Sequence, residues 1–488
     1  MLTFREFCTA GDSSNALSVG GTKRFAVACL LLVPFLLATA AAAAGEKPTA
    51  LRLEQLIEMA LAENPQMGVA RGALKAADAR LGQQQAGYYP KIAVEGRIEQ
   101  VTLNAATPRE SRSYLDFSSI DPSLGRVYVA NPDEDMTGYT RTSAAVSAEY
   151  MLVDFGRRNG GVRSAEERLG AARAALSGTE NETVLNVVSA YFNILKAEEL
   201  VGVERESRSR KREAVKLART LHEAGRGTVG DVARAEADLG QAEVELTRAE
   251  NELQLSRLAL RRAVGVAPGG PPLELSRKSR LADPGRLVSE LDALVERAIG
   301  RRPEVEAQQR TIAATQAAVQ KERAEYRPSV NLFANYSVQR YEDQDAAANY
   351  GLGVQVRWSL FDGGLRSNRV GETRAQLIQE QERLRDLQLG VATDVRDAQQ
   401  RYREASERLR LTGKVLTASE LDLKLARKGY KEGIRTFYDL SVAESNYRNA
   451  MAQRVVAQYD LQGAIARLYW SLGSMDSLYG EDAGSVAP

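Results

Sequence analysis

The chain contains the same pattern of sequence twice. Residues 53–90 recur as residues 291–328, 238 positions later, with matching leucines, glutamates, alanines and prolines. Residues 225–265 recur as residues 433–473, at a spacing of 208. Thirty additional residues therefore lie in the first copy, between Pro90 and Asp154. A supersecondary unit that occurs twice indicates one structure with internal symmetry rather than two unrelated domains.

The N-terminal region has the pattern of a secretory signal peptide. Lys23 and Arg24 precede an apolar run that ends in alanines. A basic flank, an apolar core and small residues at the end predict cleavage near Ala44, so residues 1–44 would be absent from the mature protein. An uncleaved helical anchor is the alternative, since the run is about long enough to span a bilayer.

Composition and motifs exclude several classes of function. Sixty-five basic and sixty-four acidic residues nearly cancel, which favours neither nucleic acid nor an acidic partner. Both cysteines, Cys8 and Cys29, lie in the predicted signal peptide, so the mature chain would have no disulfide or thiol nucleophile. Nucleotide-binding loops, nucleophile elbows and His/Cys metal clusters are also missing from the sequence. We therefore expect no enzyme, no cofactor and no metal site.

Each copy contains a helical tract far longer than the helices of globular proteins. No proline occurs within residues 157–224 or 365–432, and a shorter helix is predicted after each tract, at 228–265 and 436–472. At about 1.5 Å per residue, each long helix would extend for roughly 100 Å. Helices of this length need lateral partners to be stable, so the sequence predicts packed helical hairpins.

Each copy also contains two segments in which apolar and polar residues alternate. Strands are predicted at about 90–101 and 142–153, and again at 328–340 and 351–361. Alternation over about ten residues indicates one apolar and one polar face, and this length suits a tilted strand that crosses a membrane. Residues 102–140 are rich in Asn, Ser, Pro, Asp and Gly and predict a long loop.

Four strands cannot close a membrane barrel by themselves. An open sheet edge in lipid leaves backbone N–H and C=O groups without hydrogen-bond partners, and the smallest membrane barrels have about eight strands. The chain is therefore expected to share its barrel with copies of itself. A soluble four-stranded sheet with one wet face is the alternative.

This arrangement resembles the TolC family of outer-membrane export ducts. The motifs that carry the resemblance are Tyr88-Tyr89-Pro90, Tyr326-Arg327-Pro328, Phe361-Asp362-Gly363-Gly364 and residues 433–439. The resemblance implies a homotrimer with a shared twelve-stranded transmembrane β-barrel and a periplasmic α-barrel made of the duplicated helical hairpins. It also implies a periplasmic adaptor protein and an inner-membrane ABC or RND transporter as partners. The expected function is type I secretion or multidrug efflux across the periplasm and outer membrane.

The repeat and the resemblance together divide the mature chain into four parts. The first repeat, a connector, the second repeat and a C-terminal tail are predicted at residues 45–265, 266–286, 287–473 and 474–488.

The resemblance also assigns roles at the tips of the two hairpins. It implies that Asp439 and Asp231 form a ring at the tunnel aperture, and that Arg435 and Tyr430 form a gate latch to the neighbouring hairpin. Val442 occupies the family's second acidic position, where it would add an apolar ring that narrows the aperture by dewetting.

Simpler structural roles remain open for these residues. Both aspartates lie three residues after a threonine, which is the pattern of a helix N-terminal capping box and is compatible with lining a pore. Arg435 could lie in solvent and Tyr430 could be a packing residue. Tyr150 and Trp358 are candidates for an aromatic belt at the membrane interface, or for core residues.

One alternative function comes from a different class. A non-conducting coiled-coil scaffold tethered to the outer membrane would share the long helices, but it would have no need for strands with a polar face.

Overall fold

The computed structural model describes residues 50–102, 114–116, 126–128, 138–270, 273–277, 279–282, 284, 291–341 and 345–478. The predicted signal peptide at residues 1–44 lies outside these residues. The chain separates into a unit of residues 1–50 and a unit that begins at Leu51.

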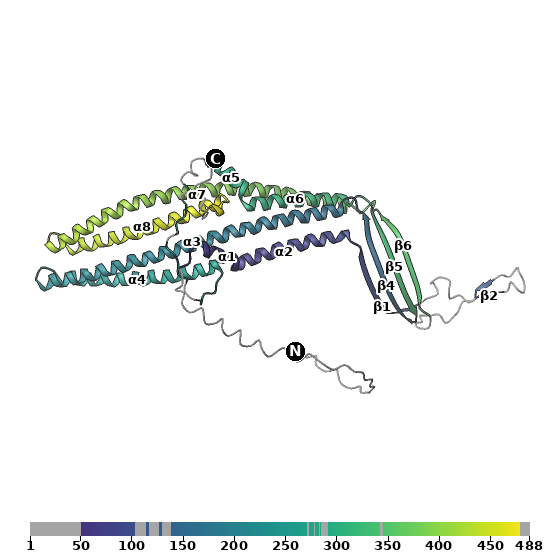
Figure 1. Ribbon diagram of the computed structural model, residues 1–488, viewed down its shortest axis with the longest axis horizontal. Helices are drawn as coiled ribbons and strands as arrows, with labels where there is room; N and C mark the ends of the chain where they lie inside the picture. The colour runs from purple at the N-terminus through teal and green to yellow at the C-terminus, as the bar shows by residue number, and fades with distance from the viewer. Residues whose placement is uncertain are drawn as a thin grey trace, which may run out of the picture. The chain divides into compact units, whose positions relative to one another are not determined.

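The second unit consists mainly of helices, with one four-stranded antiparallel sheet (Figure 1). Its first half contains helices α1 (Leu53–Glu63), α2 (Pro65–Gln85), α3 (Arg157–Glu223) and α4 (Val229–Val264). Its second half contains α5 (Leu291–Arg301), α6 (Pro303–Ala324), α7 (Leu365–Glu432) and α8 (Phe437–Ser471). Two short 3₁₀ helices are η1 (Ala86–Tyr88) and η2 (Met475–Leu478).

The long helices pack in pairs. Helix α3 packs along α4 and α7 packs along α8, while α3 also contacts α8 and thereby joins the two hairpins. Helices α2 and α6 pack beside α3, and α6 also packs against α7. The four helices of the two hairpins differ from their predicted ranges by no more than one residue at either end.

The break between α1 and α2 follows directly from the sequence. Pro65 has no N–H and takes the first helical position, and the Asn64 side chain caps α2 by accepting from the Gln66 N–H at 2.8 Å. The same Asn64 donates from Nδ2 to the Ala263 carbonyl at 2.8 Å, near the end of α4. Gly265 follows with φ +92°, and a Cβ there would lie 2.7 Å from the Asn64 Cα. Only glycine adopts this positive φ without strain and also leaves room for the Asn64 backbone, which explains why a glycine ends the first repeat.

The main core lies where the short helices meet the middle of α3. Leu56, Val188, Tyr191 and Leu260 are buried there, with α1, α3 and α4 all contributing. A second cluster surrounds Val395 between α5, α6, α7 and α8. A third cluster lies near the hairpin tips and draws on α3, α4, α7 and α8.

The sheet has the strand order β1-β4-β5-β6. Its strands are β1 (Lys91–Thr102), β4 (Gly138–Val153), β5 (Ser329–Tyr341) and β6 (Ala347–Arg357), and all neighbours are antiparallel. Strands β1 and β6 are therefore the two edges. A separate pair, β2 (Tyr114–Asp116) and β3 (Arg126–Tyr128), lies within the segment predicted to be a loop.

The strand register aligns the apolar residues of all four strands on one face. Val94 lies opposite Val146, which lies opposite Tyr336, which in turn lies opposite Tyr350. The other face carries polar residues such as Glu95, Ser147, Asn335 and Gln339. These faces are called the apolar face and the polar face below. Among the described residues, no helix offers a stretch that is both long enough and apolar enough to cross a bilayer.

Three predicted boundaries need correction. Strand β6 spans Ala347–Arg357 rather than 351–361, because its pairing with β5 runs from Ala347, opposite Gln339, to Arg357, opposite Ser329. Strand β4 begins at Gly138 rather than 142, since its pairing with β1 continues as far as Thr102. The predicted tail at 474–488 begins with η2, whose Met475 and Leu478 are buried in the main core.

Candidate functional site

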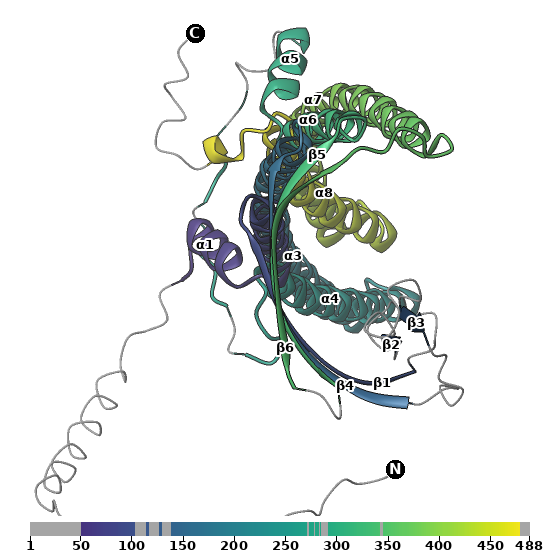
Figure 2. The same cartoon turned by 90° about the vertical axis from the view of Figure 1, so that its right-hand side faces the viewer.

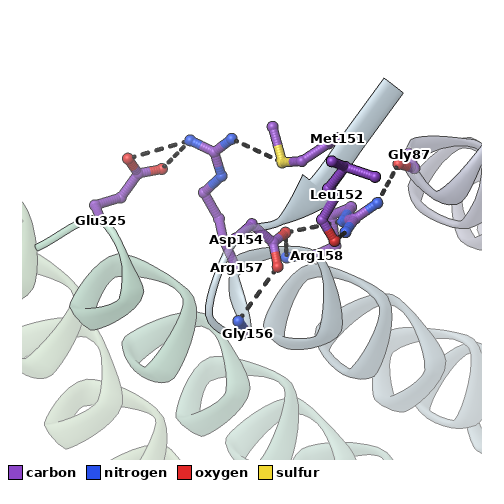
Figure 3. A network of polar contacts seen from close by, with 8 residues as sticks. All are labelled: Gly87, Met151, Leu152, Asp154, Gly156, Arg157, Arg158 and Glu325. Atoms are coloured by element: carbon purple, nitrogen blue, oxygen red, sulfur yellow. Dashed lines mark hydrogen bonds and ion pairs between the residues drawn. The ribbon is translucent and has the colours of Figure 1, made fainter. Parts of the chain in front are cut away.

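The same hydrogen-bonded turn connects each strand pair to its long helix. Figure 3 shows the turn of the first repeat. Asp154 Oδ2 accepts from the backbone N–H of Arg158 at 2.7 Å and from its Nε at 3.0 Å. Asp362 Oδ2 accepts in the same way from Arg366, at 3.2 and 2.6 Å. The bond from Arg366 is also the main reason that the pKa of Asp362 lies below its ordinary value.

Each arginine of these turns also reaches the end of the preceding short helix. Arg158 donates to the Gly87 carbonyl at 3.1 Å, and Arg366 donates to the Glu325 carbonyl at 3.2 Å. Each guanidinium lies over a tyrosine ring, Tyr88 or Tyr326. The strands, the short helix and the long helix are therefore fixed to one another at one point in each repeat.

Sequence reasoning missed these arginines, although a signal was present. Asp154 and Arg158 recur as Asp362 and Arg366 at the repeat spacing of 208, with glycine between them in both copies. An aspartate two residues before a glycine at a strand-to-helix turn predicts a carboxylate that caps the helix.

The two tip aspartates form capping boxes. The Asp231 N–H donates to the Thr228 hydroxyl at 3.1 Å, and Asp231 Oδ2 accepts from the Thr228 N–H at 3.1 Å. Asp439 and Thr436 make the same two bonds at 3.2 and 2.9 Å, and the Thr436 hydroxyl also donates to Asp439 at 2.7 Å. That hydroxyl is the main reason that the pKa of Asp439 lies below its ordinary value. The structural role is observed here, while the aperture ring stays a prediction.

Tyr430 is a packing residue in the single protomer. Its ring lies edge-on to Phe437, with centroids 5.5 Å apart, inside an apolar cluster that includes Ala218, Ala235 and Leu440. The cluster draws on all four helices of the two hairpins and therefore joins their tips. The phenolic OH is buried and has no hydrogen-bond partner among the described residues. Burial raises the pKa of Tyr430, and the nearby Asp231 charge adds to this effect.

Arg435 contacts its own hairpin in the protomer. Its Nη1 donates to Asp422 Oδ1 of α7 at 3.2 Å, and its stem crosses Gly429, where a Cβ would lie 2.9 Å from the Arg435 Cγ. Both side chains of the ion pair are exposed. A latch between Arg435 and the neighbouring hairpin therefore stays a prediction.

Val442 lies on α8 with 39% of its surface exposed, one turn beyond Asp439. Next to it in the chain, Ser441 is buried between the hairpins. The predicted apolar ring would therefore use a side chain that the protomer leaves uncovered.

A buried ionic cluster joins the two hairpins below the tips. Lys211 of α3 lies 3.0 Å from Asp238 Oδ2 of α4 and 3.2 Å from Glu444 Oε2 of α8. The Ser441 hydroxyl of α8 donates to the same Asp238 oxygen. Lys211 and Glu444 are almost fully buried, and burial is the main cause that raises the pKa of Glu444 above its ordinary value. We name Lys211, Asp238, Ser441 and Glu444 the inter-hairpin cluster.

A second ion pair, between a buried glutamate and a partly buried arginine, strengthens the same contact. Arg448 of α8 binds the Glu204 carboxylate of α3 with two nitrogens: Nε lies 3.1 Å from Oε2 and Nη2 lies 2.6 Å from Oε1. In the sequence these covered charges look like the solvated charges of the same helices. The signal that separates them is weak, because only packing decides which charged residues of a long helix are covered.

The two predicted belt residues lie near the end of the sheet that joins the helices. Tyr150 is on the apolar face, opposite Leu332, and is partly buried. Trp358 follows the end of β6 and has 59% of its surface exposed, with Tyr89 and Phe361 exposed nearby in the two linking segments. Exposed aromatic residues at one end of an apolar face fit an interfacial belt, which stays a prediction.

Comparison with known proteins gives one family and several relatives. The family model described as "Outer membrane efflux protein" matches residues 56–266 and 294–474. Protein CyaE of Bordetella pertussis is 28% identical over 436 residues, which cover 87% of this chain and 84% of CyaE. The alkaline protease secretion protein AprF of Pseudomonas aeruginosa is 24% identical over 366 residues, which cover 70% of this chain and 71% of AprF.

A solved structure agrees with the fold. The outer membrane protein VceC of Vibrio cholerae superposes with a TM-score of 0.69 at 19% identity, over 86% of this chain and 96% of VceC. At this level of identity the agreement concerns the fold alone.

Proposed function

Because the chain belongs to the outer membrane efflux protein family, we propose that three copies of it assemble into one closed export duct. The protein is an efflux or secretion channel of the outer membrane. The proposal adds a trimeric barrel, a tunnel made of the helical hairpins and a gate at their tips.

The sheet is the observation that carries this proposal. It combines one apolar face, one polar face and two unpaired edges, β1 and β6. In lipid the backbone groups of each edge strand need a partner strand. In the trimer, β1 of one copy would pair with β6 of the next at each of the junctions between copies. Closure turns the apolar face toward lipid and the polar face toward the duct.

The helices support the same assembly. Their contacts give the row α4-α3-α8-α7, so α4 and α7 each have one side free of hairpin partners. Large apolar residues are exposed on both end helices, including Val244 and Leu255 of α4 and Val415 and Leu425 of α7. In a ring of three copies, α4 of one protomer would cover these residues on α7 of the next.

Secretion of a polypeptide by a type I system is the substrate class that we favour over multidrug efflux. The name of the relative AprF supports it, because AprF is described as a protease secretion protein. Energy would come from an inner-membrane ABC or RND transporter joined through a periplasmic adaptor, since the sequence contains no nucleotide-binding motif.

The gate would lie at the hairpin tips. Asp231 and Asp439 would ring the aperture, and Val442 would add an apolar constriction beside them. Separation of the second hairpin from its neighbours would break contacts of Arg435 and Tyr430 and widen the mouth. Replacing both residues should raise the open probability, and unchanged conductance and open probability would show that they are not a latch.

Conductance in planar bilayers tests the whole proposal. Purified protein should insert and give discrete unitary currents, because the closed barrel holds a continuous aqueous path. A non-conducting scaffold tethered to the outer membrane would give no such currents, even when it binds to the bilayer.

A further inference from the structure

A small pocket of about 100 Å³ lies where β5 and β6 meet the helices. Two of its lining residues, Ser329 and Arg357, are register partners on the polar face of the sheet. The pocket is therefore on the polar face. Its other charged residues are Asp154, Arg157, Glu325 and Arg327.

Both carboxylates of this pocket are already paired. Asp154 Oδ2 forms an ion pair with Arg158 Nε at 3.0 Å, and Glu325 Oε1 forms one with Arg157 Nη1 at 3.3 Å (Figure 3). Arg157 is held further by a bond to the Met151 sulfur. Two guanidinium groups, those of Arg327 and Arg357, remain without an ion-pair partner in the part of the chain that the structure describes. The Arg327 guanidinium lies over the Phe155 ring, 6.0 Å from its centroid.

These arginines are not a consequence of the internal repeat. At the spacing of 238, Tyr89 stands in the first copy where Arg327 stands in the second. At the spacing of 208, Glu149 stands where Arg357 stands. The positive charge is therefore a property of the second repeat alone, at a position where the shared fold does not require it.

We infer that this pocket binds an oxyanion, a carboxylate or phosphate group carried by the transported substrate, and that it makes this end of the barrel favour anions. Guanidinium forks match planar carboxylate and phosphate groups, and the Ser329 and Ser359 hydroxyls line the same pocket as further donors. The inference rests on the proposed trimer, in which the polar face lines the duct. A lipid phosphate has the same chemistry, but it would lie against the apolar face.

The ion selectivity of single channels tests this inference. The double variant Arg327→Gln, Arg357→Gln removes two positive charges from each protomer. In planar bilayers under a KCl gradient, its K⁺/Cl⁻ permeability ratio should rise by about twofold or more over the unmodified channel, as expected for rings of charge in a pore. Inorganic phosphate should reduce the chloride current of the unmodified channel and have less effect on the variant.

The control is the double variant Arg277→Gln, Arg280→Gln, which makes the same charge change in the connector. Arg277 pairs with Glu198 of α3, and Leu275, two residues before it, forms a β-bridge with Leu51 just before α1. Figure 2 shows α1 beside α3. This control should keep the selectivity of the unmodified channel.

The outcomes separate the inference from the proposed function. Unitary currents with an unchanged permeability ratio in the arginine variant would overturn the oxyanion site and leave the channel intact. A difference that appears only in bilayers with phosphatidylglycerol, and not in purely zwitterionic ones, would assign the site to a lipid headgroup and also overturn the inference. If the unmodified protein gave no currents, the proposed duct itself would fail.

Discussion

At the scale of single residues, the inter-hairpin cluster is the most consequential feature of the helical region. Lys211 is the only cation within ion-pair distance of the Glu444 carboxylate among the described residues, and it also neutralises Asp238. Burial of both partners means that the attraction is weakly screened, while the loss of one partner leaves a desolvated charge. The contact between α3 and α8 therefore depends on Lys211 more than on any exposed ion pair.

Replacing Lys211 by Met should destabilise the protein by about 3 kcal/mol or more at neutral pH, because it leaves two carboxylates without their cation. The double variant Lys211→Met, Glu444→Gln should recover much of this loss. Thermal unfolding of the detergent-purified protein provides the measurement. Equal midpoints for Lys211→Met and the unmodified chain would show that the cluster does not hold the hairpins together.

The pH dependence of the same cluster has a definite sign. The pKa of Glu444 is raised in the folded state, so the folded state binds its proton more tightly than the unfolded state does. The contribution to stability is full below the ordinary glutamate pKa and is lost as pH rises through the raised value. Glu444→Gln should therefore flatten the dependence of the unfolding midpoint on pH between mildly acidic and neutral conditions. A profile as steep as that of the unmodified protein would assign the titration to another group.

Tyr430 allows packing to be separated from gating. Its OH is buried without a hydrogen-bond partner among the described residues, so Tyr430→Phe should leave the stability unchanged or raise it by up to about 1 kcal/mol. If that OH bonds to a neighbouring copy in the closed trimer, the same variant should increase the open probability. The matched variant Phe437→Leu perturbs the ring contact and keeps the OH, so a similar gain in opening from both variants would point to loosened packing instead.

At the scale of elements, each helical hairpin is defined by its ends. Both second helices begin at a capping box with the same threonine and aspartate spacing, and both long helices begin after an aspartate and glycine turn. These are local features with strong residue preferences, and the sequence therefore predicted the hairpin boundaries closely.

Other elements were less predictable, for physical reasons. The alternation of apolar and polar residues continues through Trp358 and Leu360, but the ladder ends at Arg357. A strand extends only as far as its backbone is paired with a neighbouring strand, whatever the alternation of its side chains. Burial on the helices was also hidden. Lys211 and Glu444 look like any charged residues of a long helix, and only the neighbouring hairpin removes them from water.

The capping box at the second tip should be needed for local order. Thr436→Ala removes the hydroxyl that accepts from the Asp439 N–H and should destabilise the start of α8 by about 1 kcal/mol. Hydrogen exchange of the tip peptides, followed by mass spectrometry, should become faster in this variant, with Thr436→Ser as the conservative control. The matched variant Thr228→Ala should loosen the first tip only. Faster exchange throughout α7 and α8 would show that the threonine acts on the whole hairpin.

At the scale of the whole molecule, the orientation of the sheet decides how copies can assemble. The apolar face is continuous across all four strands, and Leu352, Val354 and Tyr350 of the edge strand β6 are largely exposed in the single protomer. An apolar surface of this size is unfavourable in water and needs a cover. In a membrane barrel, lipid covers the apolar face while the polar face stays in contact with water.

A pair of arginine substitutions on β6 tests that orientation. Leu352 lies at the middle of the strand on the apolar face, so Leu352→Arg should cost about 2–4 kcal/mol per protomer in the bilayer and reduce recovery of the assembled protein from outer membranes. Asn349 lies three residues away on the polar face, opposite Ser337, and Asn349→Arg should assemble normally because its charge remains in water. Both variants add the same side chain to the same edge strand, so a general effect on folding or on strand pairing would lower both yields together. Equal loss would contradict a lipid-facing apolar face, and with it the closed barrel, whereas loss confined to Leu352→Arg requires that one face of the sheet meets hydrocarbon and the other meets water.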